Sequence, residues 1–150
     1  MTQIFLEDLS VGQRFSSGSL TVSEADIIAY ARQFDPQPFH TDPDAAKDTF
    51  FGGLAASGWH TASLTMKLLV GSELNIAGGL IGAGGELAWP RPTRPGDTLR
   101  LAMEVLAVKP SKSRPERGMV TVRCETLNQN NEAVQVFTVN MVVLRRNPAP

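Results

Sequence analysis

The chain is poor in the residues that build disulfide frameworks and thiol-rich metal sites. It has one cysteine, Cys124, and two histidines, His40 and His60. A single cysteine cannot form an internal disulfide, and this favours a reducing, cytoplasmic compartment. These three side chains also fall short of a His/Cys zinc site, so we expect neither a metal nor a cofactor. Cys124 alternates with Val120 and Val122, and we expect it to be a small, buried side chain.

A charge excess of either sign is also missing, as is a long apolar run. The 14 Lys and Arg residues almost balance the 15 Asp and Glu residues, which leaves a net charge of −1. Nucleic acid is therefore not expected as a partner, because a large footprint on it needs a basic excess. No stretch of about 18 apolar residues predicts a membrane span, and the first residues lack the pattern of a signal peptide. The composition, 42% hydrophobic and 19% charged, predicts one domain over residues 1–150.

Apolar periodicity predicts one strand, then helices, and then a run of further strands. Ser23 is a candidate N-cap for a helix that ends at Asp35, and Pro43 to Phe50 is a candidate short helix. Residues 58–70 predict a helix whose only charged residue is Lys67, so it should be largely buried. Strands are predicted at residues 13–21, 86–89, 98–108, 119–127 and 133–144. This order predicts an α+β fold in which an antiparallel sheet covers a central helix.

The segment from Asp35 to Asp42, Asp-Pro-Gln-Pro-Phe-His-Thr-Asp, carries the most chemical information. Each proline fixes its own φ and restricts the residue before it. We therefore expect a stiff, extended turn that holds Asp35 and His40 at a set distance, as proton transfer requires. The alternative is a proline-rich turn in which Asp35 caps a backbone amide and His40 packs at a surface.

The same segment resembles a known family signature. Asp35-x-Gln-Pro-Phe-His40-x-Asp42 resembles the Asp-x-Asn-Pro-[Leu/Ile/Val]-His-x-[Asp/Glu] motif of the MaoC-like (R)-specific enoyl-CoA hydratases. Ser57-Gly58 resembles the start of that family's central helix, and Pro-Gly-Asp at residues 95–97 resembles a turn of hot-dog domains. The resemblance extends over roughly residues 6–145.

The resemblance implies a hot-dog fold, in which a long antiparallel sheet wraps around one central helix. It also implies a dimer or higher oligomer that binds an acyl-CoA thioester near the subunit interface. Asp35 and His40 would activate the water that adds to a trans-2-enoyl thioester or leaves in the reverse dehydration. The Gly58 N–H would bind the thioester carbonyl, with Gln37, Ser57 and Trp59 beside the substrate.

Two positions depart from the family pattern. Gln37 replaces the family's asparagine and is one methylene longer, so the pair that it orients can shift. Met66 stands where the family's hydratases often carry a serine in the central helix, with Ser63 and Thr65 nearby. Both departures bear on the substrate and on the activity more than on the fold.

Two other functions remain open at this stage. The first is a hot-dog acyl-CoA thioesterase, although residues 58–70 lack the Asp or Glu that many of these enzymes use on the central helix. The second is a non-catalytic acyl-CoA binding domain in which Gln37 marks a decayed site.

Several further residues have both a functional and a packing interpretation. His60 could touch the thioester or could be a core or interface histidine with a satisfied N–H. Trp89 could line an acyl or pantetheine channel or simply pack beside the central helix. Gly78 to Gly85 is expected to be a mobile loop or bulge, because no strand precedes it and no helix follows it. Basic side chains that could meet CoA phosphates or remain solvated are Arg91, Arg94, Lys109, Lys112, Arg114 and Arg117.

Overall fold

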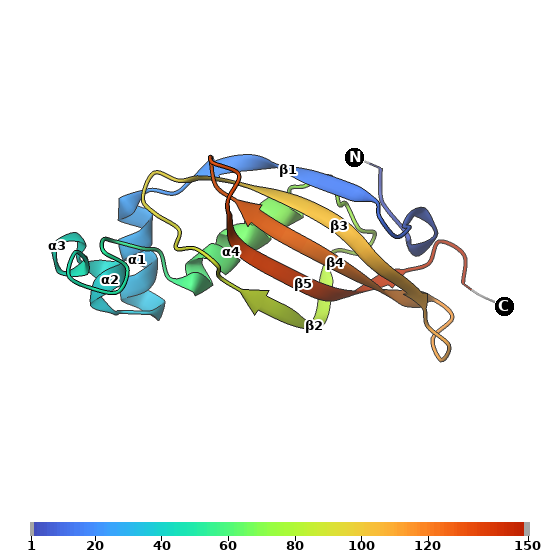
Figure 1. The fold of residues 1–150 in the computed structure, drawn as a ribbon. Helices are drawn as coiled ribbons and strands as arrows, with labels where there is room; N and C mark the ends of the chain where they lie inside the picture. Colours follow the sequence, from blue (N-terminus) through green and yellow to red (C-terminus); the bar gives the residue numbers. More distant parts are fainter. Residues whose placement is uncertain (1, 149–150) are drawn as a thin grey trace.

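A five-stranded sheet wraps around helix α4 (Gly58–Val70) in the computed structural model, which describes residues 2–148 (Figure 1). The strands are β1 (Arg14–Thr21), β2 (Ile81–Ala88), β3 (Thr98–Pro110), β4 (Arg117–Leu127) and β5 (Ala133–Leu144). The other helical segments are η1 (Leu6–Asp8), α1 (Glu24–Phe34), α2 (Pro38–Thr41) and α3 (Pro43–Ala46). The predicted α+β hot-dog arrangement is confirmed.

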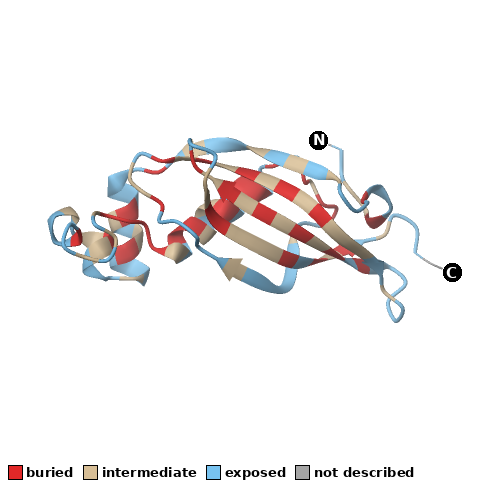
Figure 2. Ribbon diagram, viewed as in Figure 1, coloured by how far each residue is buried: buried red, intermediate tan, exposed pale blue. Residues whose placement is uncertain are grey.

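The sheet is antiparallel throughout, with the strand order β1-β3-β4-β5-β2. Strands β3, β4 and β5 follow one another along the chain and lie in the middle, as hairpin connections dictate. Their side chains alternate between the helix side and the solvent side, which Figure 2 shows as alternating bands of burial. Strands β1 and β2 form the two edges.

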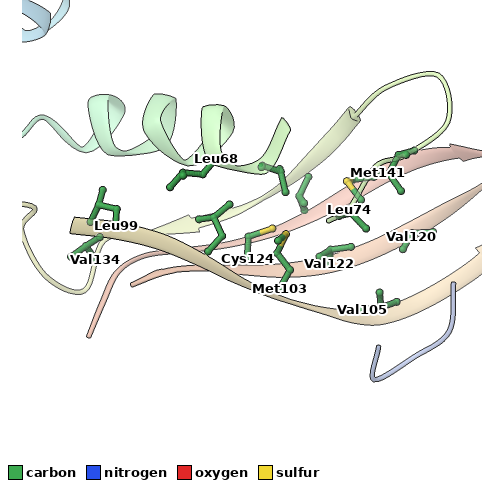
Figure 3. Close-up of a cluster of buried hydrophobic side chains, with 14 of the residues drawn as sticks. Leu68, Leu74, Leu99, Met103, Val105, Val120, Val122, Cys124, Val134 and Met141 are labelled. Carbon is green, nitrogen blue, oxygen red and sulfur yellow. The ribbon is translucent and has the colours of Figure 1, made fainter. Parts of the chain in front are cut away.

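The core lies between the concave face of the sheet and one face of α4 (Figure 3). Leu68 of α4 packs over Leu99, Met103 and Cys124 in this layer. Cys124 is fully buried, and burial raises the pKa of its thiol to about 12. The thiol therefore stays protonated at neutral pH, and the expectation of a small buried side chain is confirmed.

Helix α4 spans the predicted residues, but one expectation about it is wrong. Leu68 and Leu69 are buried, whereas Trp59, Met66 and Val70 on the opposite face are 60%, 42% and 66% exposed. A single sheet covers only one side of a helix, so the apolar character of the other side needs a different explanation. In the described chain, α4 is half-buried rather than largely buried.

Two local expectations also need correction. The short helix predicted from Pro43 to Phe50 ends at Ala46 and is followed by turns. The glycine-rich stretch from Gly78 to Gly85, expected to be a loop, contains most of strand β2. A Cβ atom on Gly85 would lie 2.3 Å from the Thr138 carbonyl oxygen of β5, so glycine permits a close approach of the two backbones there.

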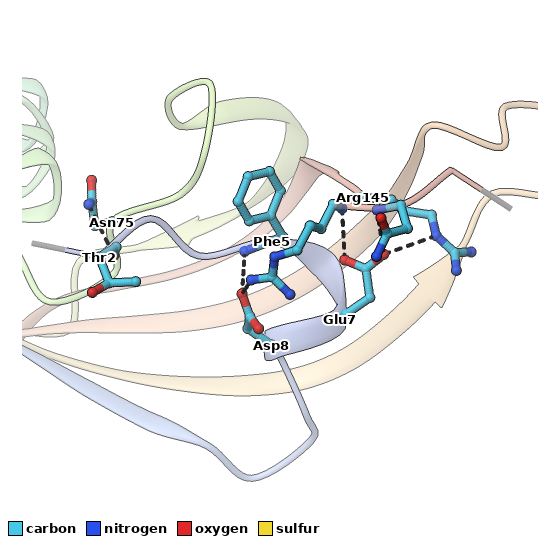
Figure 4. Close-up of polar contacts among 8 residues, drawn as sticks. Thr2, Phe5, Glu7, Asp8, Asn75 and Arg145 are labelled. Carbon is cyan, nitrogen blue, oxygen red and sulfur yellow. Dashed lines mark hydrogen bonds and ion pairs between the residues drawn. The ribbon is translucent and has the colours of Figure 1, made fainter.

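Segment η1 and the residues after β5 lie side by side at one end of the sheet (Figure 4). Glu7 accepts hydrogen bonds from the backbone N–H of Arg146 and from the side chain of Arg145, and Asp8 pairs with Arg146. The Arg146 N–H chiefly lowers the pKa of the Glu7 carboxyl, and the backbone N–H of Phe5, followed by the Arg146 side chain, lowers the pKa of Asp8. These contacts fix η1 against the region where β4 begins and β5 ends. Within residues 2–148, no helix has the length and apolar character needed to cross a membrane.

Candidate active site

The Asp35–Asp42 segment joins two helices. Asp35 is the C-cap of α1, and its backbone N–H donates to Ala31 at 2.8 Å. Gln37 is the N-cap of α2 and Pro38 is its first residue, a position that proline tolerates because it lacks an N–H. The expected stiff turn is therefore extended only up to Gln37. Its second half is one helical turn, which places His40 back toward Asp35.

Asp35 and His40 come together as the motif predicted. The Nε2 atom of His40 lies 3.3 Å from Asp35 Oδ2, and the two side chains are 6% and 19% exposed. The Nδ1 atom of His40 lies 2.6 Å from the carbonyl oxygen of Ala55. A carbonyl only accepts, so Nδ1 carries the proton and Nε2 is the atom that faces Asp35.

Polar contacts keep Asp35 ionised. The Gln37 side chain donates from Nε2 to Asp35 Oδ1 at 2.6 Å. Burial raises the pKa of the Asp35 carboxyl, but Gln37, the nearby Ser57 hydroxyl and the charge of His40 lower it and outweigh burial. The result is a carboxyl whose pKa lies below its usual value. Asp35 is thus a carboxylate at neutral pH and can accept a proton from water.

The segment before α4 links His40 to the start of that helix. Ala55 receives the His40 Nδ1–H on its carbonyl, and its own N–H donates to the Phe39 carbonyl at 3.0 Å. Two residues further on, Ser57 is the N-cap of α4 and is fully buried. Its hydroxyl has no hydrogen-bond partner within residues 2–148, although it lies near enough to Asp35 to lower the pKa of that carboxyl. A short, buried stretch of backbone therefore sets both the ring of His40 and the entry into α4.

Gly58 begins α4, where unsatisfied N–H groups carry partial positive charge. A Cβ atom at this position would lie 2.6 Å from Cε2 of Trp89. Glycine is therefore required because an indole ring packs on it, a reason that the local sequence does not reveal. Trp89 is held in turn by a 2.9 Å hydrogen bond from Nε1 to Gln135 Oε1 of β5.

A cavity of about 380 Å³ brings these elements together. His40 and Gly58 lie in its wall, together with Phe51, Thr61 and Trp89. The hydroxyl of Thr61 is bonded to that of Thr93 at 2.9 Å, which ties α4 to the segment after β2. Polar groups converge on a mostly apolar hollow, as in sites for small substrates.

Some predicted site residues lie elsewhere. Among the described residues, the cavity wall includes Trp89 but not Trp59, whose ring meets Trp89 edge-on at 5.3 Å and is 60% exposed. Asp35, Gln37 and Ser57 do not line the hollow either: Gln37 and Ser57 act on Asp35, and Asp35 contacts His40 in the cavity wall. Sequence reasoning missed Phe51 and Thr61, and no local signal marks them, because their role depends on how distant segments fold together.

His60 packs away from this cavity. Its ring stacks on Tyr30 with the centroids 4.5 Å apart, and it is buried. Burial lowers its pKa, which Asp26 offsets in part. The interpretation as a packing histidine is supported, but Nδ1 has no hydrogen-bond partner within residues 2–148. Nδ1 of His60 therefore does not provide the satisfied N–H that this interpretation expected.

Two of the candidate basic residues have structural partners. Arg94 donates to the carbonyls of Phe51, Gly53 and Leu54, and so holds the segment before α4. Arg91 lies at the cavity and pairs with Glu132 at 3.1 Å. Residues 2–148 contain no group of three His, Cys, Asp or Glu side chains that could hold a metal ion.

Comparison with known proteins agrees with the fold. The MaoC like domain model matches residues 8–128. The chain is 37% identical over 142 residues to the uncharacterized protein YdeM of Bacillus subtilis, covering 93% of this chain and 96% of that one. It is 32% identical over 109 residues to an (R)-specific enoyl-CoA hydratase of Rhodospirillum rubrum, covering 72% and 74%.

A solved structure is more similar still. The MaoC-like dehydratase from Rhodospirillum rubrum superposes with a TM-score of 0.94 at 59% identity, covering 96% of this chain and 99% of that one. The matched region contains α1, α2 and α4, and with them the Asp35–His40 pair and the Gly58 helix end. The chain therefore belongs to the MaoC-like domain family.

Proposed function

We propose that the protein is an acyl-CoA hydratase/dehydratase, which adds water to a trans-2-enoyl-CoA or removes it from a 3-hydroxyacyl-CoA. The observation that carries the proposal is the pair of Asp35 Oδ2 and His40 Nε2, 3.3 Å apart, close to the N-terminus of α4. In this proposal a single water binds to both atoms. The similarity to an (R)-specific enoyl-CoA hydratase supports the same reaction class.

In the hydration direction, Asp35 is the primary base. Its carboxylate takes a proton from the water, whose oxygen forms a bond to C3 of the enoyl group. His40 Nε2 orients that water and stabilises the charge that develops, while the Ala55 carbonyl holds the ring in place through Nδ1–H. The electron pair of the C2–C3 double bond moves toward the thioester carbonyl. C2 then takes the proton that Asp35 removed from the water, which completes the addition of one water molecule and restores the carboxylate.

The carbonyl oxygen becomes negatively charged in this step. The Gly58 N–H at the start of α4 is the donor that we assign to it, since helix N-termini favour negative charge. Dehydration runs through the same groups in reverse. No cofactor is required beyond the coenzyme A that belongs to the substrate.

We also propose that the working form is a symmetric homodimer. Strand β2 is an edge whose residues, apart from Leu87, are exposed. The exposed apolar residues Met66 and Val70 of α4 lie on the face that the sheet leaves uncovered. An open edge and an apolar face favour association with a second copy.

One assay tests the reaction against the two other functions. Purified protein is mixed with crotonyl-CoA, and both the enoyl-thioester absorbance and free thiol are followed. Loss of absorbance without thiol is the expected result and identifies a hydratase. Release of thiol would identify a thioesterase instead. If a panel of enoyl-CoA thioesters of different chain length gives neither signal, the hydratase proposal is wrong.

A further inference from the structure

The hairpin between β3 and β4 concentrates positive charge that nothing in the described chain neutralises. Lys109, Lys112, Arg114 and Arg117 form no ion pair within residues 2–148. Elsewhere in the described chain Arg14, Arg123 and Arg146 pair with carboxylates, and the unpaired Arg32, Lys67 and Arg100 are spread over different elements. Glu116 is the one acidic residue of the hairpin tip. For a chain with a net charge of −1, this is a marked local segregation of charge.

The hairpin also forms a defined hollow. A cavity of about 380 Å³ is lined by Lys109, Arg114 and Arg117 together with the hydroxyl-bearing Ser111 and Ser113. Backbone bonds order the tip, from the Ser111 N–H to the Arg117 carbonyl at 3.1 Å and from the Arg117 N–H to the Arg114 carbonyl at 3.2 Å. Several cations and hydroxyls around one hollow suit phosphate groups, which accept charge-assisted hydrogen bonds.

The base of the hairpin is fixed by the N-terminal segment. A Cβ atom on Gly118 would lie 2.6 Å from Leu6 of η1, so these segments are in close contact. The Arg145 N–H donates to the Glu116 carbonyl at 2.9 Å, which ties the hairpin to the end of β5. The cations are therefore presented from an anchored support.

The loop between β3 and β4 lies at the opposite end of the sheet from the start of α4 (Figure 1). Thr93 borders the catalytic cavity just before β3 begins, whereas Lys109 is at the far end of that strand. A strand as long as β3 covers roughly 40 Å at about 3.3 Å per residue. A thioester in the catalytic cavity of one chain therefore does not extend to the hairpin of the same chain.

The catalytic cavity itself lacks a free permanent cation. Arg91 is the only Lys or Arg among the described residues that line it, and Glu132 already pairs with it at 3.1 Å. A CoA thioester carries several phosphate charges outside the catalytic cavity. Those charges need a partner that the wall of this cavity does not provide.

A second copy of the chain can provide a partner for these phosphate charges. If the exposed edges of two β2 strands pair antiparallel, the two-fold axis exchanges the ends of the two sheets. The hairpin of each copy is then carried to the side of its partner's catalytic cavity. We propose that the β3–β4 hairpin of one subunit binds the phosphate groups of the CoA thioester held in the catalytic site of the other. This inference rests on the proposed function and on the proposed dimer.

A charge-neutral hairpin tests the assignment. The hairpin variant combines Lys109→Gln, Arg114→Gln and Arg117→Gln, and its matched control combines Arg14→Gln, Arg32→Gln and Lys47→Gln, which are exposed cations on other elements. We expect the hairpin variant to raise KM for crotonyl-CoA at least about tenfold, because charge-assisted contacts are lost. Crotonyl-pantetheine, which has no phosphate, should be hydrated equally by both variants and the wild type. An unchanged KM for crotonyl-CoA would overturn the proposal.

Mixed dimers test whether the hairpin acts on the partner's site. One chain carries Asp35→Asn with an intact hairpin, and the other carries the neutral hairpin with an intact Asp35. Two different affinity tags isolate the heterodimer. We expect its KM for crotonyl-CoA to return to the wild-type value, because the working site then faces an intact hairpin. A KM that stays raised would show that the hairpin serves its own chain and would refute the proposal.

Direct binding separates this inference from the proposed reaction. Calorimetry with coenzyme A itself requires no turnover, and we expect the hairpin variant to bind it at least about tenfold more weakly than the wild type. If the wild type hydrates no thioester but still binds coenzyme A through the hairpin, the reaction is wrong and the binding site stands. If the hairpin variant loses binding of inorganic phosphate but binds coenzyme A as tightly as the wild type, the hairpin is an independent anion site and the proposal fails.

Discussion

His40 Nδ1 lies 2.6 Å from the carbonyl oxygen of Ala55, and this contact defines what the ring can do. Because Nδ1 donates to this carbonyl, the ring is oriented with Nε2 directed at Asp35. The same backbone segment continues to Ser57 and then into α4. The position of the imidazole and that of the Gly58 N–H are therefore set by one short, buried connection. Few substitutions in this segment can move the imidazole of His40 without also moving the Gly58 N–H.

The first prediction concerns the two catalytic side chains. Asp35→Asn and His40→Ala should each lower kcat for crotonyl-CoA at least about 10²-fold, because general acid–base groups contribute about 10²–10⁴-fold. In the proposed mechanism the two act on one water, so the double variant should be barely slower than the single variants. Steady-state kinetics measure the loss, and circular dichroism with thermal unfolding checks that the fold is retained.

His60→Ala is the matched control for this experiment. Its ring stacks on Tyr30 outside the catalytic cavity, so its loss should affect stability more than kcat. Near-wild-type turnover in both Asp35→Asn and His40→Ala would show that the site is misassigned. His60 would then be the next histidine to test.

The second prediction uses the contact between Gln37 and Asp35. The pKa of Asp35 is lowered, with Gln37 as the hydrogen-bond donor to its carboxylate. A base must be ionised, so kcat/KM should fall as the pH drops through this low pKa. Gln37→Ala removes a contact that stabilises the ionised form, and the acid limb of the profile should therefore move to higher pH. Gln33→Ala, an exposed amide on α1, should leave that limb unchanged. A limb that stays in place in Gln37→Ala would show that Asp35 is not the group that titrates.

Much of this arrangement could be read from local patterns. The extent of α4 follows from its run of helix-compatible residues between Ser57 and Gly71. The Asp35–His40 pair follows from a motif short enough for the chain itself to bring its ends together. In both cases the decisive interactions are local, so one stretch of sequence contains the information.

The remaining features depend on residues that are far apart in the sequence. Trp89 covers Gly58 and bonds Gln135, and Arg94 clamps the carbonyls of residues 51, 53 and 54. Nothing near any of these residues predicts its partner. The sequence predicted only the end of strand β2, and its first part, residues 81–85, was taken as a loop because glycine is a poor strand former; its pairing with β5 compensates for that local preference.

The third prediction concerns assembly. The wild type should scatter light as a dimer, with a mass of twice 16.2 kDa, at micromolar concentration. Met66→Glu combined with Val70→Glu places two charges on the exposed apolar face of α4 and should give a monomer, because buried unpaired charge is strongly unfavourable. Val11→Glu is the control, since Val11 is 68% exposed and lies outside α4 and β2. A wild-type protein that remains monomeric under these conditions would contradict the proposed dimer and the cross-subunit role of the hairpin together.

The last prediction concerns the packing of Trp89 on Gly58. Gly58→Ala adds a Cβ atom that would lie 2.6 Å from the indole ring, closer than carbon atoms can approach. The ring must move, and its 2.9 Å hydrogen bond to Gln135 must stretch or break. We expect a loss of about 1–3 kcal/mol in the free energy of unfolding, which is typical of overpacking. Hydration should also slow, because the displaced ring lines the same cavity as His40.

A double-mutant cycle isolates this contact from the helix propensity of the new alanine. Trp89→Leu should be destabilising by itself, because it removes buried ring surface and the bond to Gln135. In the double variant, however, the alanine at position 58 meets no ring, so Gly58→Ala should cost much less than it does beside tryptophan. Urea unfolding of the four proteins gives the coupling free energy. Strict additivity would mean that the ring does not enforce glycine at the start of α4, and the requirement would then have to come from the ligand that approaches the helix end.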